Sequence, residues 1–312
     1  MQDIQGSPEH AERSKKPRTQ TKRPSVVRCE SVDLSYCQNI SPKLKCQFSI
    51  PTDSWITGID VNSDNQILLS AGKSGLIFLY TEDGQLIQKK QFSNPLWDCG
   101  LLSDGKIALL TEEAINVYTS DFFFIWKIKL KNFAPYHMVI DQDNFVITAD
   151  LVHDKVRIYN GFDGYPVSEF QIKVPQSKTM ECKQNLYQTA VAINSMDEIC
   201  IADPTQPVLR VFSSTGYLIN KLPILKDPKS KSVIQPCAIC VDNEDRIWFA
   251  DDCGKHLYVA PMYGDAEGKL APSGRLHLEA YGLSRTQAMV CTKQGSLVVV
   301  DEGNQTAVLQ IL

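Results

Sequence analysis

The chain has 312 residues, 43% of them hydrophobic, and a formal net charge of −4. This length and apolar content suffice for a large folded core and exclude a wholly disordered polymer. The sequence has no run of about 18 consecutive apolar residues and begins with a polar stretch unlike a secretory signal, so it predicts a cytoplasmic protein without a membrane-spanning helix.

Residues 1–42 are the first predicted segment, a basic and polar N-terminal arm that we expect to be disordered. They are rich in Ser, Pro, Gln, Lys and Arg, and their charge of +2 leaves −6 for the rest of the chain. A basic cluster runs from Lys15 to Arg23 and lies just before Ser25. Three interpretations remain open for it: a solvated tail, a nuclear-import signal, or a kinase recognition sequence that directs phosphorylation to Ser25.

Residues 43–312 are predicted to form one domain. It opens with a lone candidate strand, Lys43 to Ile50 (KLKCQFSI), and continues with a hairpin pattern that occurs six times. Each hairpin has an apolar pair, a polar turn and then an apolar run such as QILLSA or RIWFAD, which is typical of two antiparallel strands. The turn residues are Asn65, Gly105, Asn144, Asp197, Asp245 and Gly295.

A third strand follows each hairpin, as in GLIFLYT and KVRIYNG, and most units add a fourth, as in FFIWKIKL and YLINKLPI. Four short strands in each of six consecutive units are typical of propeller blades. No segment shows a helical spacing of apolar residues. The sequence therefore predicts an all-β, six-bladed β-propeller.

The sixth unit ends at Leu312, directly after its third strand, and would leave a sheet edge unpaired. The segment Lys43 to Ile50 resembles the fourth strands of the other units. We therefore expect this N-terminal strand to close the last blade and to lock the ring.

The second hairpin strands of units three to five end in Ala149-Asp150, Ala202-Asp203 and Ala250-Asp251, and the sixth keeps Asp301. This pattern resembles the NHL repeat over about residues 54–312, although units one and two carry Ala71 and Thr111 at the acidic position. The resemblance implies a propeller like those that end TRIM-NHL ubiquitin ligases and bind protein or RNA. Distantly related six-bladed propellers are hydrolases or lyases. Residues 1–42 show no RING pattern, so ligase activity would require another chain or a longer one.

The strand-end acids have a predicted structural role. A carboxylate at such a position can accept backbone N–H bonds from the residues that follow and so fix the turn between the second and third strands. We expect this role for Asp150, Asp203, Asp251 and Asp301 rather than a metal-binding or catalytic one.

No catalytic, cofactor-binding or metal-binding residues are predicted. The ten cysteines are spread through a large domain and are expected to be free thiols, and the single C-x-x-C, Cys237 and Cys240, has no matching second pair. Among the histidines only His137 lies on a first strand. The corresponding positions in the other units are Gly58, Asp98, Ala190, Ala238 and Ala288, and Asp60 and Asp98 are the only acids expected near the axis.

The remaining hypothesis is recognition by the rim where the fourth-to-first and second-to-third strand loops meet. Aromatic and basic side chains there could anchor a protein or peptide ligand. The candidate rim residues are Trp55, Trp97, Tyr136, His137, Lys178, Lys183, Tyr187, Lys226, Lys229, Lys231, Lys255 and Arg285. We expect a non-catalytic protein-interaction scaffold. RNA binding through the same lysines is the first alternative, and a hydrolase or lyase is the second.

Overall fold

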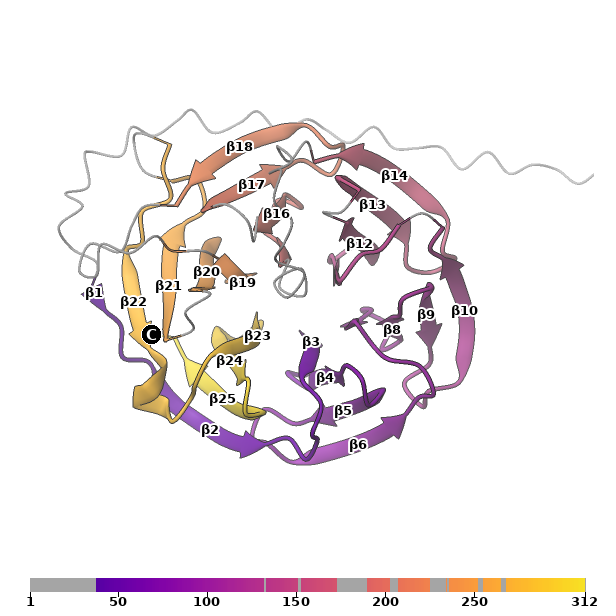
Figure 1. Cartoon of the computed structure of the whole chain (residues 1–312), viewed down its shortest axis with the longest axis horizontal. Coiled ribbons are helices and arrows are strands. Elements are labelled where there is room, and N and C mark those ends of the chain that lie inside the picture. The colour runs from indigo at the N-terminus through magenta and orange to yellow at the C-terminus, as the bar shows by residue number, and fades with distance from the viewer. Residues whose placement is uncertain are drawn as a thin grey trace, which may run out of the picture.

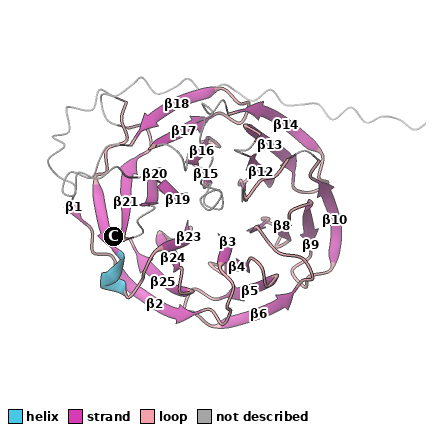
Figure 2. Cartoon of the chain, in the orientation of Figure 1, coloured by secondary structure: helices cyan, strands magenta, loops and turns pink. Residues whose placement is uncertain are grey.

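The computed structural model describes residues 38–131, 133–150, 153–172, 190–202, 207–224, 234, 236–251, 255–264 and 268–311. Within these ranges the chain is almost entirely β, and its strands form six sheets arranged like blades around a central axis (Figures 1 and 2). The predicted six-bladed β-propeller is confirmed. No helix in these ranges has the length and apolarity that crossing a membrane requires.

Each blade runs from an inner strand at the axis to an outer strand at the circumference (Figure 1). Blade 1 contains β3 (Ile56–Val61), β4 (Ile67–Ala71), β5 (Leu76–Tyr80) and β6 (Leu86–Gln91). Blade 2 contains β7 (Asp98–Leu101), β8 (Ile107–Leu110), β9 (Ala114–Tyr118) and β10 (Phe124–Lys129). Blade 3 contains β11 (His137–Ile140), β12 (Phe145–Asp150), β13 (Lys155–Asn160) and β14 (Pro166–Gln171).

The other three blades follow the same order. Blade 4 contains β15 (Val191–Ile193), β16 (Ile199–Ala202), β17 (Val208–Phe212) and β18 (Leu218–Pro223). Blade 5 contains β19 (Pro236–Val241), β20 (Arg246–Asp251), β21 (His256–Pro261) and β22 (Gly274–His277), with β1 (Gln38–Asn39) on its outside. Blade 6 contains β23 (Thr286–Cys291), β24 (Ser296–Asp301), β25 (Gln305–Gln310) and β2 (Lys43–Ser49).

The six predicted turn residues explain why each hairpin forms. All six have a positive φ, between 55° at Asp245 and 82° at Gly105. In the first hairpin the N–H of Asn65 donates to the Asn62 carbonyl at 3.1 Å, and the N–H of Asn62 donates to the Gln66 carbonyl at 3.2 Å. Asn, Asp and Gly tolerate the left-handed conformation that such a loop requires, so these short polar sequences specify the hairpins locally.

Blade 6 joins the two ends of the chain. Strand β2 pairs antiparallel with β25, from Lys43 opposite Gln310 to Ser49 opposite Gln305. Beyond this ladder, the N–H of Ile50 donates to the Asn304 carbonyl at 2.9 Å, and Asn304 Nδ2 donates to the Thr52 carbonyl at 2.8 Å. The predicted closure of the ring by an N-terminal strand is confirmed.

The boundary of the N-terminal arm differs from the sequence prediction. Gln38–Asn39 fall within the segment expected to be disordered, yet they form β1, which pairs parallel with β22. Ile40 continues this contact, because its N–H donates to the Arg275 carbonyl at 2.7 Å and its side chain occupies the space that the missing side chain of Gly274 leaves free. Composition gives no sign of such a distant partner. Ser25 and the Lys15–Arg23 cluster lie outside the described residues.

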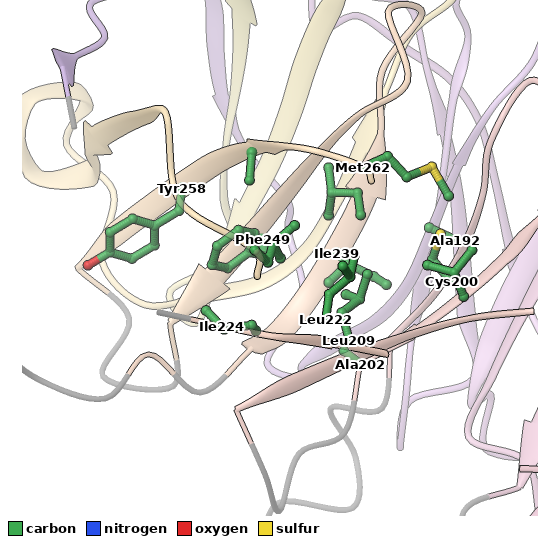
Figure 3. Packing of buried hydrophobic residues seen from close by; sticks show 14 of the residues in the cluster. Ala192, Cys200, Ala202, Leu209, Leu222, Ile224, Ile239, Phe249, Tyr258 and Met262 are labelled. Carbon is green, nitrogen blue, oxygen red and sulfur yellow. The ribbon is translucent and has the colours of Figure 1, made fainter. Parts of the chain in front are cut away.

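The core lies between neighbouring blades. Second and third strands are largely buried, and the outer strands expose most of their side chains. Figure 3 shows one interface, between blades 4 and 5, where Leu209 and Leu222 of blade 4 meet Ile239 and Phe249 of blade 5. Because both faces of each blade are covered in this way, every sheet is stabilised mainly by its two neighbours.

Candidate functional site

A pocket opens on the axis, at the end of the propeller where the fourth-to-first strand loops enter the inner strands. Its volume is about 440 Å³, part of which is open solvent. All six blades contribute polar or small residues from the beginning of their inner strands. The lining includes Thr57, Gly58, Asp98, His137, Ala190, Cys237, Ala238, Gln287 and Ala288. We call this pocket the axial funnel.

Small residues allow the inner strands to approach closely at the funnel. A Cβ atom at Gly58 would lie 2.0 Å from Asp98 Oδ1 and 2.7 Å from the backbone nitrogen of Cys99. The neighbouring inner strand therefore occupies the space of the missing side chain. The corresponding positions in blades 4, 5 and 6 carry alanines, which also have small side chains.

An Asp–His pair forms one wall of the funnel. His137 Nδ1 lies 3.4 Å from Asp98 Oδ2, and the two residues come from the inner strands of blades 3 and 2. Asp98 is almost fully buried, and it accepts the N–H of Met138 at 2.8 Å and that of Cys99 at 2.7 Å. Burial raises the pKa of Asp98, and the nearby His137 partly offsets this effect.

Asp60 makes a similar link between blades 1 and 2. Its Oδ2 accepts the N–H of Leu101 at 2.7 Å, and its Oδ1 accepts the N–H of Val61 at 2.7 Å. Desolvation by burial raises the pKa of Asp60 to about 7, while the two backbone donors act in the opposite direction. The sequence named Asp60 and Asp98 as the acids near the axis, and both act there as connections between inner strands.

Two of the strand-end acids show the contacts expected of them. Asp301 Oδ1 accepts the N–H groups of Gly303 at 2.9 Å and Gln305 at 2.8 Å, and its Oδ2 accepts the N–H and the hydroxyl of Ser284, both at 2.8 Å. Asp150 likewise accepts the N–H of His153 at 3.0 Å and that of Ala134 at 2.6 Å. Each carboxylate thus fixes the turn after its strand and also holds the loop that enters its own blade.

Among the candidate rim residues, Trp55 is the most exposed aromatic, with 67% of its surface accessible, and it directly precedes the strand that lines the funnel. Trp97 and Tyr136 are half-buried instead, with their rings edge to face and 5.1 Å apart. Lys255 is exposed and pairs with Glu279 at 3.1 Å, and Arg285 is half-buried. The expectation of rim aromatics that anchor a ligand therefore fits Trp55 better than Trp97 or Tyr136.

The other candidate rim residues are not placed. Lys178, Lys183, Tyr187, Lys226, Lys229 and Lys231 lie outside the described residues. Thr57 and Gln287, by contrast, line the funnel without having been predicted. Gln287 Oε1 accepts the N–H of Ile56 at 3.0 Å, and Thr57 Oγ1 donates to the Leu96 carbonyl at 2.9 Å. Their position at the start of an inner strand could have identified them, because every blade contributes the residues at that position to the lining of the funnel.

Nothing in the described part of the chain brings three or more His, Cys, Asp or Glu side chains into a metal-binding arrangement. The described cysteines, Cys46, Cys99, Cys200, Cys237, Cys240 and Cys291, are free thiols, as expected. Cys237 lines the funnel, whereas Cys240 Sγ lies 3.4 Å from Cys291 Sγ on the next inner strand. The chemistry that the funnel itself offers is hydrogen bonding together with the Asp98–His137 pair.

The sequence matches no family model and no curated protein. Solved structures do resemble it. Virginiamycin B lyase from Staphylococcus aureus aligns with a TM-score of 0.57 and 15% identity over 87% of this chain and 89% of that one. The Pan2 WD40 domain of Neurospora crassa aligns with a TM-score of 0.57 and 10% identity, over 85% of this chain and 94% of that one. At these identities the likeness shows the propeller fold alone.

Proposed function

We propose that this chain is a non-catalytic protein-interaction scaffold that binds a protein or peptide segment at the mouth of the axial funnel. We further propose that it is the substrate-recognition module of a TRIM-NHL-like ubiquitin ligase system. The Ala-Asp strand ends of the repeat support the second proposal. The rigid ring supports the first, since it holds loops of six blades around one opening.

The observation that carries the proposal is the exposure of Trp55 beside the funnel. Tryptophan is among the residues that contribute most to binding energy at interfaces. Its backbone is held firmly, because the Trp55 carbonyl accepts the N–H of Gly72 at 2.9 Å. The side chain is therefore presented from a fixed position and needs little ordering when a partner binds.

Site-specific photocrosslinking tests this function. A photoreactive benzoylphenylalanine in place of Trp55 should form a crosslink to a discrete protein in cells. The matched control is the same substitution at Tyr217, which is 68% exposed and belongs to the third-to-fourth strand turn of blade 4, on the opposite face. Equal crosslinking at both positions would contradict a binding face at the funnel. Recovery of RNA rather than protein from the Trp55 position would favour the RNA-binding alternative.

The Asp98–His137 pair favours a second candidate function, that of a hydrolase or lyase. A buried carboxylate beside a histidine that lines a pocket can orient that histidine as a general base. One protein of similar fold is a virginiamycin B lyase. Purified protein should then turn over a lactone-containing substrate, and His137→Ala should abolish the turnover. Turnover that His137→Ala leaves unchanged would assign the activity to a contaminant.

A further inference from the structure

The outer strand β10 of blade 2 differs from the other blade edges. Its side chains alternate along the strand: Trp126 and Ile128 are half-buried, whereas Lys127 and Lys129 are exposed, and Lys131 is exposed just beyond its end. The three lysines make no ion pair with any other described residue. An outermost strand presents unpaired backbone N–H and C=O groups along its free side. In β10 these groups lie between an apolar row and a basic row.

The pairing with β9 shows how the two rows are arranged. Lys127 lies opposite Asn116 and Lys129 opposite Ala114, whereas Trp126 lies opposite Val117 and Ile128 opposite Ile115. Val117 and Ile115 belong to the core shared with blade 3, so Trp126 and Ile128 face blade 3 and the lysines face blade 1. One face of the edge is therefore apolar, and the other is positively charged.

The backbone of β10 is free to pair on its outer side. The N–H of Leu130 donates to the Glu113 carbonyl at 2.8 Å and so points toward β9. Because N–H directions alternate along a strand, the N–H groups of Lys127 and Lys129 point away from β9. Both residues can donate to an added strand.

The edges of blades 1, 3, 4 and 5 lack this combination, and on the blade 6 edge Lys45 of β2 pairs with Glu82 at 2.9 Å. Blade 5 is already covered by β1, which shows that an outer strand of this propeller accepts a further strand. Blade 4 has Pro223 at the position equivalent to Lys129, and it provides no N–H donor there. Blade 3 carries Glu169, which pairs with Lys155 and Arg157. The corresponding stretch of blade 1 is Gln-Lys-Lys-Gln, residues 88–91, without an apolar row.

An aromatic cluster continues the apolar character at the start of β10. Phe123 and Phe124 are 70% and 57% exposed, and the exposed Phe162 of blade 3 lies next to Trp126, whose Nε1 donates to the Phe162 carbonyl at 3.0 Å. Phe122 has a φ of 61° at a turn position where other blades have Gly84, Gly164 and Gly216. A bulky residue is costly in this conformation, and the buried Phe122 ring, 5.9 Å from that of Phe92, stabilises the turn that presents Phe123 and Phe124.

We propose that the free edge of β10 is a docking site for an extended segment of another protein in which acidic and apolar residues alternate. The segment adds to blade 2 as a fifth strand. Its acidic side chains lie beside Lys127 and Lys129, and its apolar side chains lie beside Trp126 and Ile128. The backbone provides affinity, and the two rows of side chains select the partner. This surface is separate from the funnel mouth that carries the proposed function.

A labelled synthetic peptide of about ten residues that alternates Glu and Val is the probe, and its fluorescence anisotropy reports binding. The wild-type protein should bind it, more tightly in about 50 mM than in about 500 mM NaCl, and should not bind a Lys-Val peptide of equal length. The double variant Lys127→Glu and Lys129→Glu should bind the Glu-Val probe about tenfold or more weakly and should gain binding to the Lys-Val peptide. If the charge reversal does not exchange the two preferences, the proposal is wrong.

A proline tests whether the backbone edge is used. Lys129→Pro removes an outward N–H at a position where blade 4 already has a proline, so the fold should survive, as circular dichroism and thermal melting will show. This variant should lose the probe. Lys221→Pro, at an outward position on β18, is the matched control and should retain it. In hydrogen exchange, the amides of Lys127 and Lys129 should gain protection when the probe binds.

Three results would overturn the proposal: unchanged probe binding by a folded Lys129→Pro variant, self-association through β10 that Lys129→Pro disperses, or preferential binding of oligouridine to this edge. Trp55→Ala should leave probe binding intact. A failure of this proposal is therefore distinguishable from a failure of the proposed function.

Discussion

Buried carboxylates occupy two kinds of position in this propeller. Asp150 and Asp301 end second strands and accept backbone N–H groups from the turns and loops around them. Asp60 and Asp98 lie on inner strands and accept N–H groups from the next blade. In both cases the carboxylate accepts backbone N–H groups that find no acceptor within the strand ladder.

Asp301→Ala should destabilise the fold strongly. The change leaves the N–H groups of Ser284, Gly303 and Gln305 without their acceptor in a partly buried setting, and each lost partner costs on the order of 1 kcal/mol. We expect the free energy of unfolding, measured in urea, to fall by about 3 kcal/mol or more. Asp64→Ala, in an exposed turn, is the control and should change it by less than about 0.5 kcal/mol. Equal effects of the two changes would contradict the assigned role.

Asp60 should make stability depend on pH. Because its folded-state pKa is raised to about 7 from an ordinary value of 3.8, the folded protein holds a proton between these values that the unfolded chain has released. Stability should therefore fall as pH rises through this window, by up to about 1.4 kcal/mol per pH unit, and level off above pH 7.

Urea titrations at a series of pH values will measure this slope. Asp60→Asn should flatten it while Asp98 keeps its own contribution, since burial also raises the pKa of that carboxyl. A wild-type protein whose stability rises from pH 5 to pH 7 would show that other groups outweigh Asp60.

At the scale of elements, outer strands differ most from blade to blade. Strand β2 lies far along the chain from the other strands of its blade and closes it, β1 covers the edge of blade 5, and β10 forms an open edge with an apolar and a basic row. Inner and second strands follow the same hairpin in every blade, because the same turn chemistry recurs six times. Variation at the outer strands therefore changes surfaces without changing the ring.

Deleting the N-terminus through Ile50 should destabilise the ring sharply. The deletion removes every backbone partner of β25 on its outer side and uncovers part of the core that includes Phe78 and Val308. We expect the melting temperature to fall by about 10 °C or more. Deletion of residues 1–37 is the control and should leave it nearly unchanged. An equal melting temperature for the two truncations would argue against closure by β2.

At the scale of the whole molecule, the ring is closed by hydrogen bonds and side-chain contacts rather than by a continuous chain. Lys43 lies opposite Gln310, so the start of β2 and the end of β25 are neighbours in one sheet. A propeller depends on each blade having two neighbours, and the joint in blade 6 supplies the last of these contacts.

A circular permutant tests this view of the joint. A short loop should connect the end of β25 to the start of β2 as an ordinary hairpin, with new ends placed between Ile172 and Ala190. Because every strand pair except the short β1–β22 pair is retained, the melting temperature should stay within about 3 °C of that of the native order. A control permutant opened between Ile147 and Thr148, inside the buried strand β12, should not fold. Unfolding of both permutants would mean that the native chain order is required.

Periodicity in the sequence predicted the blades because hairpins are local. Asn65, Asp245 and the other turn residues adopt positive φ for reasons contained within a few residues. The partner of Lys43–Ser49 was also predictable, since one missing strand and one extra strand had to match. The short strand Gln38–Asn39 was not, because its partner is more than two hundred residues away and its composition is that of a polar arm.

The sequence by itself determined the all-β repeat, the number of blades and the closing strand, since these depend on local turn chemistry and on counting strands. Only the tertiary structure decided which side chains meet at the axis, why Gly58 must lack a side chain beside Asp98, and which blade edge a further strand covers. These properties arise where different blades touch. Contacts between segments that are distant in the chain leave no periodic pattern in the sequence, so the sequence does not predict them.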